Sequence, residues 1–250
     1  MAIDHPNTVA LLHYWGADAS QTFLDESGKS WTAVGSAQID TAQYKFGSSS
    51  GLFNGTTDQI KTAYTTDFNF NGVAWTIDTW FRCTSFAANR VIISKDKYGV
   101  NWDWGIEIAN STTFNLHTNG YTTTVTGTVS AMSTNTWYHI AYVHDATNIN
   151  MYLNGTNFKT QAVTITNNSN EYLSIGSNGW NSPHDFFPGH IAETRVMKGI
   201  AFWTANFTPS TSAYGIQGNK TTWFFMQKTK RLWDKVGGLY IPRQQGLVTI

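Results

Sequence analysis

The sequence predicts an all-β fold, a sandwich of two antiparallel sheets, and three observations predict it. Short runs of β-branched and aromatic residues recur about every ten residues, separated by Gly, Asn, Ser and Asp. Helical periodicity is nearly absent. Residues 137–155 form two apolar runs around a polar break, and in both runs successive side chains alternate between two faces, as in a half-buried strand. Many short strands at regular spacing are typical of a sandwich.

Residues 137–155 are the clearest part of this pattern. The run 137–144 is apolar on both faces, which is expected of an inner strand in a two-layer stack. The polar break 145–148 and the second run 149–153 complete a predicted hairpin. Asn154-Gly155 is a strong signal for a tight turn, so we expect a third strand from Phe158.

The remaining strands follow from the same alternation and from the turn residues between runs. Asn119-Gly120 is a second predicted hairpin turn. The other expected strands are residues 9–15, 31–34, 52–53, 59–62, 75–83, 91–95, 104–109, 113–118, 121–125, 171–176 and 189–197.

Composition limits the classes of protein that the chain can represent. Its 250 residues suffice for one large β domain or two small ones. Aromatic residues make up 15% and charged residues 13%, which argues against a disordered chain. Because the net charge is zero, the protein as a whole is not attracted electrostatically to nucleic acid or to an acidic membrane. The single cysteine, Cys83, cannot form an internal disulfide, and we expect it to be a buried apolar residue.

Targeting signals are not apparent in the sequence. No apolar run approaches the roughly 20 residues of a membrane-spanning helix. The first residues have neither a basic end nor an apolar core, so we predict no secretory signal and synthesis in a cytoplasm.

Charge divides the chain near residue 216, and we predict a sandwich domain over 1–215 and a C-terminal arm over 216–250. The first part has ten Lys and Arg against fifteen Asp and Glu, a net of −5. The arm has six basic residues against one acid, a net of +5. It either packs back on the sandwich or docks on another subunit, and we favour docking. A nucleic-acid arm is the weaker interpretation, because the cations lie on no recognisable motif. The expected docking residues are Trp223, Phe224, Phe225, Lys228, Arg231 and Trp233.

Spaced motifs give the chain a resemblance to a known family. They are LLHYWGAD at 11–18, KFGSSSGLFNGT at 45–56, WYHIAYV at 137–143 with MYLNG at 151–155, and GHIAETRVMKG at 189–199 followed by FWTANFTP at 202–209. Over about residues 8–215 the chain resembles the laminin G-like, concanavalin A-like domains, in the form often appended to bacteriophage structural proteins. The resemblance implies a jelly-roll sandwich of two curved antiparallel sheets. It implies glycan or protein binding in some members, scaffolding in others, and calcium at the sandwich rim in some.

From this resemblance we expect a non-enzymatic structural protein of a virion, a tail component or a capsid decoration. Its expected partners are other virion subunits, through the arm, and a host-surface glycan. We expect a homo-oligomer located in the virion and made in the host cytoplasm, with neither membrane nor nucleic acid as a partner. The alternatives are a glycoside hydrolase of the same fold and a free carbohydrate-binding lectin module.

Two segments, 97–104 and 177–187, combine aromatic residues with Asn and Asp, a mixture that suits sugar binding and protein contact equally. Trp104 matches a core position of the family, so we assign it to packing. The second segment also contains Asn178 and Asp185. The candidate carbohydrate-binding residues are Tyr98, Asn101, Trp102, Asp103, Trp180, Asn181 and His184.

The sequence gives little support for catalysis or for metal binding. A retaining glycosidase needs two carboxylates about 5 Å apart. The nearest match, Asp103 and Glu107, would place them roughly 13 Å apart along a strand, so we expect no enzyme. Calcium needs six to eight oxygen ligands, and the weak candidates are Asp18, Asp25 and Asp96; no other cofactor is expected. Glu193 and Arg195 fit the family pattern, and we expect them to form a structural ion pair.

Overall fold

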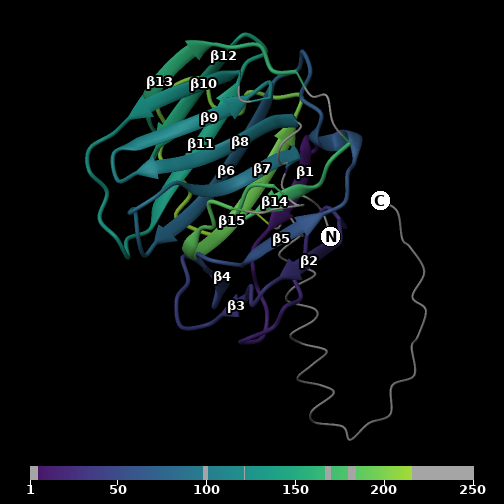
Figure 1. The fold of residues 1–250 in the computed structure, drawn as a ribbon, viewed down its shortest axis with the longest axis vertical. Helices are drawn as coiled ribbons and strands as arrows, with labels where there is room; N and C mark the ends of the chain where they lie inside the picture. Colours follow the sequence, from purple (N-terminus) through teal and green to yellow (C-terminus); the bar gives the residue numbers. More distant parts are fainter. Residues whose placement is uncertain (1–4, 98–100, 121, 167–169, 180–183, 216–250) are drawn as a thin grey trace, which may run out of the picture.

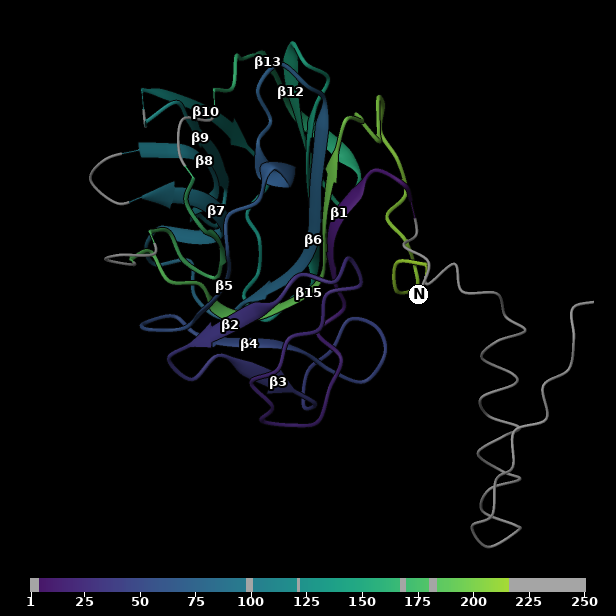
Figure 2. The ribbon, with the colours of Figure 1, turned by 90° about the vertical axis from the view of Figure 1, so that its right-hand side faces the viewer.

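The described residues form fifteen strands in two antiparallel sheets that pack face to face (Figure 1). The computed structural model describes residues 5–97, 101–120, 122–166, 170–179 and 184–215, apart from the side chains of residues 96, 97, 101 and 102. Seen from the side, β7–β10 lie in one layer and β6, β15 and β1 in the other (Figure 2). The predicted sandwich of two antiparallel sheets is therefore confirmed.

The first sheet, called sheet A, has eight strands, one of which is the long, bent strand β15. β1 pairs with one half of β15 and β4 with the other half. In spatial order the strands of sheet A are β13 (Thr156–Ala162), β12 (Asn148–Leu153), β11 (Tyr138–His144), β6 (Trp75–Cys83), β15 (Pro188–Lys198), β4 (Ser50–Asn54) and β3 (Gln38–Asp40), with β1 (Thr8–Leu12) beside β15.

The second sheet, called sheet B, has seven strands. A short 3-10 helix, η1 (Thr66–Phe68), lies between the β5 and β6 strands in the chain. In spatial order the strands of sheet B are β10 (Thr123–Thr128), β9 (Thr113–Thr118), β8 (Asn101–Asn110), β7 (Arg90–Lys97), β14 (Leu173–Ile175), β5 (Gln59–Thr62) and β2 (Trp31–Val34).

The predicted hairpins are present. β11 lies between β12 and β6, as its two apolar faces predict. Asn154 and Gly155 join β12 to β13 with φ angles of 49° and 79°, and Asn119 and Gly120 follow β9 with 54° and 72°. Asn and Gly are the residues that tolerate such left-handed conformations, which is why these dipeptides identify the turns.

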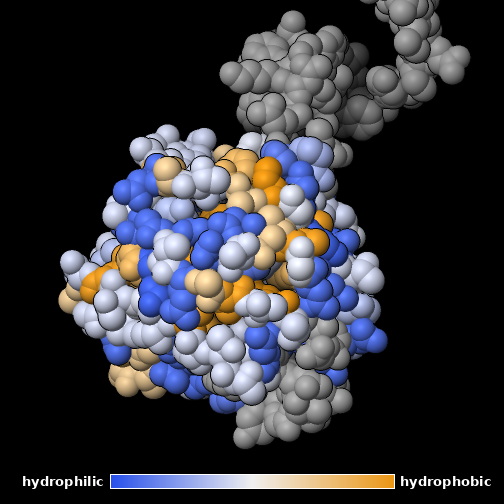
Figure 3. Space-filling model, turned by 90° about the horizontal axis from the view of Figure 1, so that it is seen from above, coloured by the Kyte–Doolittle hydropathy of each residue, from blue (hydrophilic) through white to orange (hydrophobic). Residues whose placement is uncertain are grey.

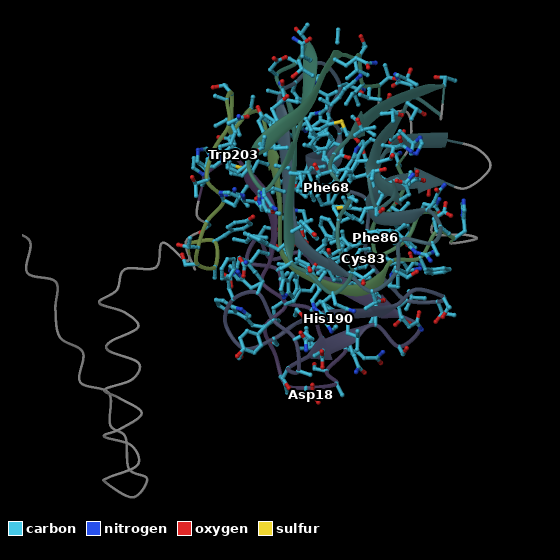
Figure 4. The ribbon with its side chains drawn as sticks, turned by 90° about the vertical axis from the view of Figure 1, so that its left-hand side faces the viewer. Asp18, Phe68, Cys83, Phe86, His190 and Trp203 are labelled. Carbon is cyan, nitrogen blue, oxygen red and sulfur yellow. The ribbon has the colours of Figure 1, made fainter. Side chains whose placement is uncertain are left out.

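The core between the sheets is aromatic. The Phe70 ring stacks on both Trp75 and Trp104, with ring centroids 5.1 Å apart in each pair, and all three side chains are fully buried. Trp104 is thus a packing residue, as expected. Phe68 and Cys83 also lie between the layers (Figure 4). Burial raises the pKa of the Cys83 thiol to about 11, so the thiol is protonated at neutral pH.

Residues 199–215, here called the C-terminal strap, run back across the outer face of sheet A, the face turned away from sheet B. Trp203 and Phe207 stack in parallel with ring centroids 3.9 Å apart, and both pack on a buried cluster that includes Val143 and Tyr152. Trp203 lies on this outer side (Figure 4). The Phe207 amide donates to the Gly155 carbonyl (2.9 Å). The strap therefore belongs to the sandwich.

A buried ionic network fixes the strap. The Arg195 guanidinium donates to Asp78 (Nε–Oδ1 2.9 Å) and lies 4.7 Å from the Phe202 ring and 4.4 Å from the Tyr214 ring. His139 Nε2 lies 2.9 Å from the Tyr214 hydroxyl oxygen and 3.3 Å from Asp78. Burial alone would raise the pKa of Asp78, but Arg195 and His139 together hold that pKa below its ordinary value.

The expected pairing of Glu193 with Arg195 is wrong. β15 shifts register between Ala192 and Arg195, and Glu193 has a φ of 54°. This bulge lets Arg195 face Asp78, whereas Glu193 accepts from the Tyr214 amide (2.9 Å) and lies 2.8 Å from His13. In a regular strand, residues two positions apart point to the same face and can contact the same neighbours. A bulge turns one of them in another direction.

Three further observations concern the whole molecule. Among the residues described, no helix is long and apolar enough to cross a membrane. Apolar and polar side chains are interspersed on the end of the molecule seen in Figure 3. The arm 216–250 lies outside the described residues, and with it the predicted docking residues Trp223, Phe224, Phe225, Lys228, Arg231 and Trp233.

Candidate functional site

Polar side chains gather on the outer face of sheet B, where β8 and β9 run side by side. In β8 the core residues Ile106 and Ile108 alternate with Glu107, which therefore points away from sheet A. β9 repeats this pattern, and Asn115 lies directly opposite Glu107. The group called here the outer-face site consists of Glu107, Asn115, His117, Asn178, His184 and Asp185.

Glu107 lies at the centre of this site. Its Oε1 accepts from Asn115 Nδ2 (2.9 Å) and lies 3.4 Å from His117 Nε2. Its Oε2 has no hydrogen-bond partner among the described residues, although the side chain is buried. His117 Nδ1 lies 3.0 Å from the Thr124 hydroxyl of β10. Because a buried carboxylate oxygen without a donor is costly, Glu107 Oε2 is suited to accept a hydrogen bond from a ligand hydroxyl.

The turn that follows β14 supplies the other half of the site. The buried side chain of Asn178 organises it: Nδ2 donates to Asp185 Oδ2 (2.9 Å) and lies 3.0 Å from His184 Nε2. The Val91 amide of β7 donates to the Asp185 carbonyl (2.8 Å), and Val91 lies opposite Glu107 in the sheet. These contacts bring the turn to the Glu107 strand, with the side chains of His184 and Asp185 40% and 25% exposed.

Asp185 is an unusual carboxyl group. Burial raises its pKa above the ordinary value, the charge of Glu107 raises it further, and His184 opposes both. Two acidic groups near each other in a partly buried setting disfavour each other's charged form, and such pairs are concentrated at functional sites. At this site a ligand would meet hydrogen-bond acceptors on Glu107 and Asp185 and hydrogen-bonding rings on His117 and His184, which is the mixture that sugar hydroxyls require.

The expected loop 97–104 is mostly strand, and Asp103 is not exposed. β8 begins at Asn101, and the backbones of Asn101 and Trp102 pair with Lys97 and Asp96 of β7. Asp103 accepts a hydrogen bond from Lys95, and the side chains of Asp103 and Lys95 are 1% and 0% exposed. The β7–β8 register shifts next to Asp103, and Lys95 lies opposite the core residue Trp104. The bulge thus turns Asp103 into a buried ion pair, which removes it from the carbohydrate candidates.

The two predicted sugar segments flank β7 from opposite ends. Asn101 pairs with Lys97 at the end of β7, whereas Asp185 bonds Val91 near its start. Six residues of strand separate those ends by roughly 20 Å. Of the predicted carbohydrate-binding residues, His184 belongs to the outer-face site. Tyr98, Trp180 and Asn181 lie outside the described residues, as do the side chains of Asn101 and Trp102.

The carboxylates proposed for metal binding have structural partners. Asp25 accepts from the Leu11 amide (3.1 Å) and from Trp31 Nε1 (2.9 Å), joining β1 to β2. Asp18 accepts from the Thr41 amide (3.0 Å), at the end of the molecule that carries β3 (Figure 4). The Asp96 side chain lies outside the description. Within the described part of the chain, no three His, Cys, Asp or Glu side chains are grouped so as to hold a metal ion.

Sequence reasoning missed Asn115 and His117, and it considered Glu107 only as a catalyst. A signal was present, because Glu107 and Asn115 each lie between two core-facing apolar residues in adjacent predicted strands, and His117 follows the core residue Leu116. Strand pairing is needed to place them opposite one another, and the sequence does not state that pairing.

Comparison with known proteins gives a family and a fold. The family model of the concanavalin A-like lectin/glucanases superfamily matches residues 54–201. Domain 4 of AbnA, a GH43 extracellular arabinanase from Geobacillus stearothermophilus solved with arabinotriose, has a TM-score of 0.59 at 17% identity, covering 77% of this chain and 93% of that one. No curated protein sequence matches the chain.

Botulinum neurotoxin structures are also similar. One, described in connection with the interaction of type C toxin with two ganglioside molecules, has a TM-score of 0.58 at 14% identity over 76% of this chain and 48% of that one. The binding domain of neurotoxin DC, in complex with rat synaptotagmin II, has a TM-score of 0.59 at 15% identity over 78% and 49%. The chain thus spans about half the length of these toxin structures, and the likeness concerns the fold.

Proposed function

Because the chain belongs to the concanavalin A-like lectin/glucanase superfamily, we propose that it is a non-enzymatic binding protein that recognises a glycan at the outer-face site. The observation that carries this proposal is Glu107, a buried carboxylate with one oxygen lacking any donor among the described residues, next to the half-exposed His184 and Asp185. Protein interiors rarely leave such an oxygen unsatisfied, and the hydroxyl of a sugar is a donor of suitable size.

Similar structures support this choice of ligand class. The AbnA domain was solved with arabinotriose, and a neurotoxin relative is linked to gangliosides by its description. The synaptotagmin complex is a reminder that the same fold also binds proteins. We favour a glycan because the residues of the site are hydrogen-bonding groups, whereas protein interfaces rely on apolar anchors.

We further infer that the protein is a structural subunit of a bacteriophage virion, on the tail or the capsid surface, and that it works as a homo-oligomer. Opposite charges on the two parts of the chain support this: residues 1–215 carry −5 and the arm +5. An arm of one subunit therefore complements the body of another. Tyr214, which precedes the arm in the chain, is held in place by Glu193 and His139.

Calorimetric titration with a panel of oligosaccharides, arabinotriose among them, tests the glycan proposal. Glu107→Gln keeps the size of the side chain but removes the charge, and it should weaken binding about tenfold or more, because hydrogen bonds to charged groups contribute about 1.5–3 kcal/mol. Glu26→Gln, a matched change in the connection between β1 and β2, should leave affinity within about twofold. Equal affinity for the Glu107 variant and the wild type would exclude the outer-face site.

A truncation after Gly215 tests the role of the arm. The shortened chain keeps the strap and its contacts, so it should melt within a few degrees of the full chain. It should sediment as a monomer and fail to join particles, whereas the full chain should oligomerise. Normal incorporation of the truncated chain would refute the docking role.

A hydrolase is the second candidate, and one observation favours it. The raised pKa of Asp185 and the charge of Glu107 nearby resemble the acid and the base or nucleophile of a glycosidase. The pair considered from sequence fails, because Asp103 is in an ion pair with Lys95. Release of reducing ends by the wild type, abolished in Asp185→Asn, would establish hydrolysis; we expect binding without release.

A further inference from the structure

Part of the outer face of sheet A is not covered by the C-terminal strap, and it carries a row of polar and aromatic side chains. Arg82 of β6 lies directly opposite His190 of β15. On the other side of β6, Tyr138 pairs with Phe81, which places Trp137 next to Arg82. The Trp137 and His190 rings approach to 6.5 Å across the Arg82 strand. These three side chains form the floor of what we call the sheet A patch, which also includes Asp40, Lys45 and Trp80.

The two ring nitrogens of His190 differ in their hydrogen bonding within the described part of the chain. Its Nε2 lies 2.8 Å from Asp40 Oδ2, and its Nδ1 has no partner among the described residues although the side chain is buried. Because a carboxylate only accepts, Nε2 carries the proton and Nδ1 offers a lone pair. Burial lowers the pKa of His190 more than Asp40 raises it, so the ring is neutral at neutral pH. Nδ1 is therefore an acceptor suited to a hydroxyl.

Two cations of the patch, Lys45 and Arg82, have no carboxylate partner among the described residues. The Lys45 ammonium lies over the Trp80 ring, 3.9 Å from its centroid, and the Phe46 ring meets Trp80 edge-on. Within the described part of the chain neither Lys45 nor Arg82 has a carboxylate partner, since Asp40 is bound to His190. Burial lowers the pKa of Lys45, which means that the charged form is destabilised where it lies. The patch thus presents donors in excess over acceptors.

We propose that the sheet A patch is a second binding site, specific for an anionic saccharide, a pyranose that carries a carboxylate or a sulfate. The guanidinium of Arg82 pairs with the anionic group, with Lys45 as an additional cation. The half-buried Trp137 stacks on the C–H face of the ring. His190 Nδ1 accepts from a neighbouring hydroxyl. An acidic peptide would satisfy the cations but would leave the hydroxyl acceptor unused, so a saccharide matches more of the patch.

The sheet A patch is independent of the outer-face site. It lies on the opposite layer of the sandwich, since β6 and β15 belong to sheet A and β8 and β9 to sheet B (Figure 2). The charge of the arm, Asp234 against six cations, does not complement the cations of the patch. Two sites on opposite faces would let one subunit bridge two stretches of polysaccharide.

The experiment is a calorimetric titration of the full chain at low salt with three oligosaccharides of equal length: an oligogalacturonate, a sulfated galactan and a neutral galactan. We expect binding of at least one anionic probe and none of the neutral one. Arg82→Gln should weaken that binding about tenfold or more, and Trp137→Ala should weaken it as well. Lys159→Gln, which removes a cation from β13 at the far edge of the same sheet, should change it less than about twofold.

The two anionic probes distinguish a carboxylate from a sulfate as the recognised group. Glu107→Gln should leave anionic binding unchanged, which separates this site from the outer-face site. Arg82 is half-exposed, so its variant should fold normally, and a melting curve verifies this. The proposal is overturned if neither anionic probe binds or if Arg82→Gln binds like the wild type. It is also overturned if poly-glutamate binds more tightly than the saccharide and displaces it.

Discussion

Replacing Asp78 by Asn should loosen the C-terminal strap and destabilise the whole domain. Asp78 is fully buried and binds Arg195 through Nε at 2.9 Å, and Arg195 is held between the strap residues Phe202 and Tyr214. The amide keeps the shape of the side chain but removes the charge with which the buried guanidinium pairs through Nε and Nη2. Breaking a buried pair on one side costs about 3–5 kcal/mol. In a domain of this size that is a fall in melting temperature of roughly 6–20 °C.

Urea unfolding of the full chain, followed by tryptophan fluorescence, measures this loss. The double variant Asp78→Leu with Arg195→Met replaces both charges by apolar groups and should recover most of the lost stability, because the penalty comes from the unpaired charge. A loss below about 1 kcal/mol for Asp78→Asn would refute the idea that this ion pair fixes the strap.

The pH dependence gives an independent check of the same residue. The folded pKa of Asp78 lies below its unfolded value of about 3.9, so the folded state binds fewer protons in that range. Its contribution is present above about pH 4 and is lost as the pH falls through the folded pKa. The Asn variant should therefore lose less stability than the wild type on acidification.

Three further predictions concern turns and the outer-face site. Gly155→Ala should destabilise the domain more than Gly120→Ala. Both glycines have a positive φ, which costs alanine about 1–2 kcal/mol, but a Cβ at Gly155 would also lie 1.8 Å from the Phe207 carbonyl oxygen and add ~1–3 kcal/mol, whereas nothing lies within 4 Å of a Cβ at Gly120. Equal melting temperatures of the two variants would contradict the packing of the strap. Asp185→Asn should raise the melting temperature at pH 7. The folded pKa of Asp185 lies above its unfolded value, so the contribution of this carboxyl group to stability is full below about pH 4 and is lost as the pH rises through the folded pKa. An unchanged melting temperature would argue against this unfavourable environment of the Asp185 carboxylate. Asp103→Asn should lower the free energy of unfolding by about 3–5 kcal/mol without affecting glycan affinity, measured by urea unfolding and calorimetry, since Asp103 forms a buried ion pair.

Alternation along strands allowed much of the sandwich to be predicted from sequence. The two faces of β11 and the Asn-Gly turns after β9 and β12 are encoded locally, because side-chain period and turn conformation depend on a few neighbouring residues. The family resemblance extended this local pattern to a jelly roll.

Bulges and long-range contacts were not predictable. The register shifts at Asp103 and Glu193 turn single side chains to new partners, and neither has a sequence signature. The resulting partners are equally hard to predict: Lys95, which pairs with Asp103, looks like a surface residue, and His13 is distant in sequence from Glu193. The outer-face site was found only in part, because Glu107 and Asn115 become neighbours through strand pairing and Asp185 through a turn that crosses to β7.

Hydrogen–deuterium exchange on the full chain, with and without a saturating oligosaccharide that binds, tests glycan recognition at the outer-face site most directly. A ligand protects the amides of the segment it covers by reducing local opening. We predict protection in β8, in β9 and in the turn containing His184 and Asp185, with no cleavage of the sugar during the measurement. Protection confined to other segments, or a sugar returned in fragments, would contradict a non-enzymatic glycan-binding site on this face of the sandwich.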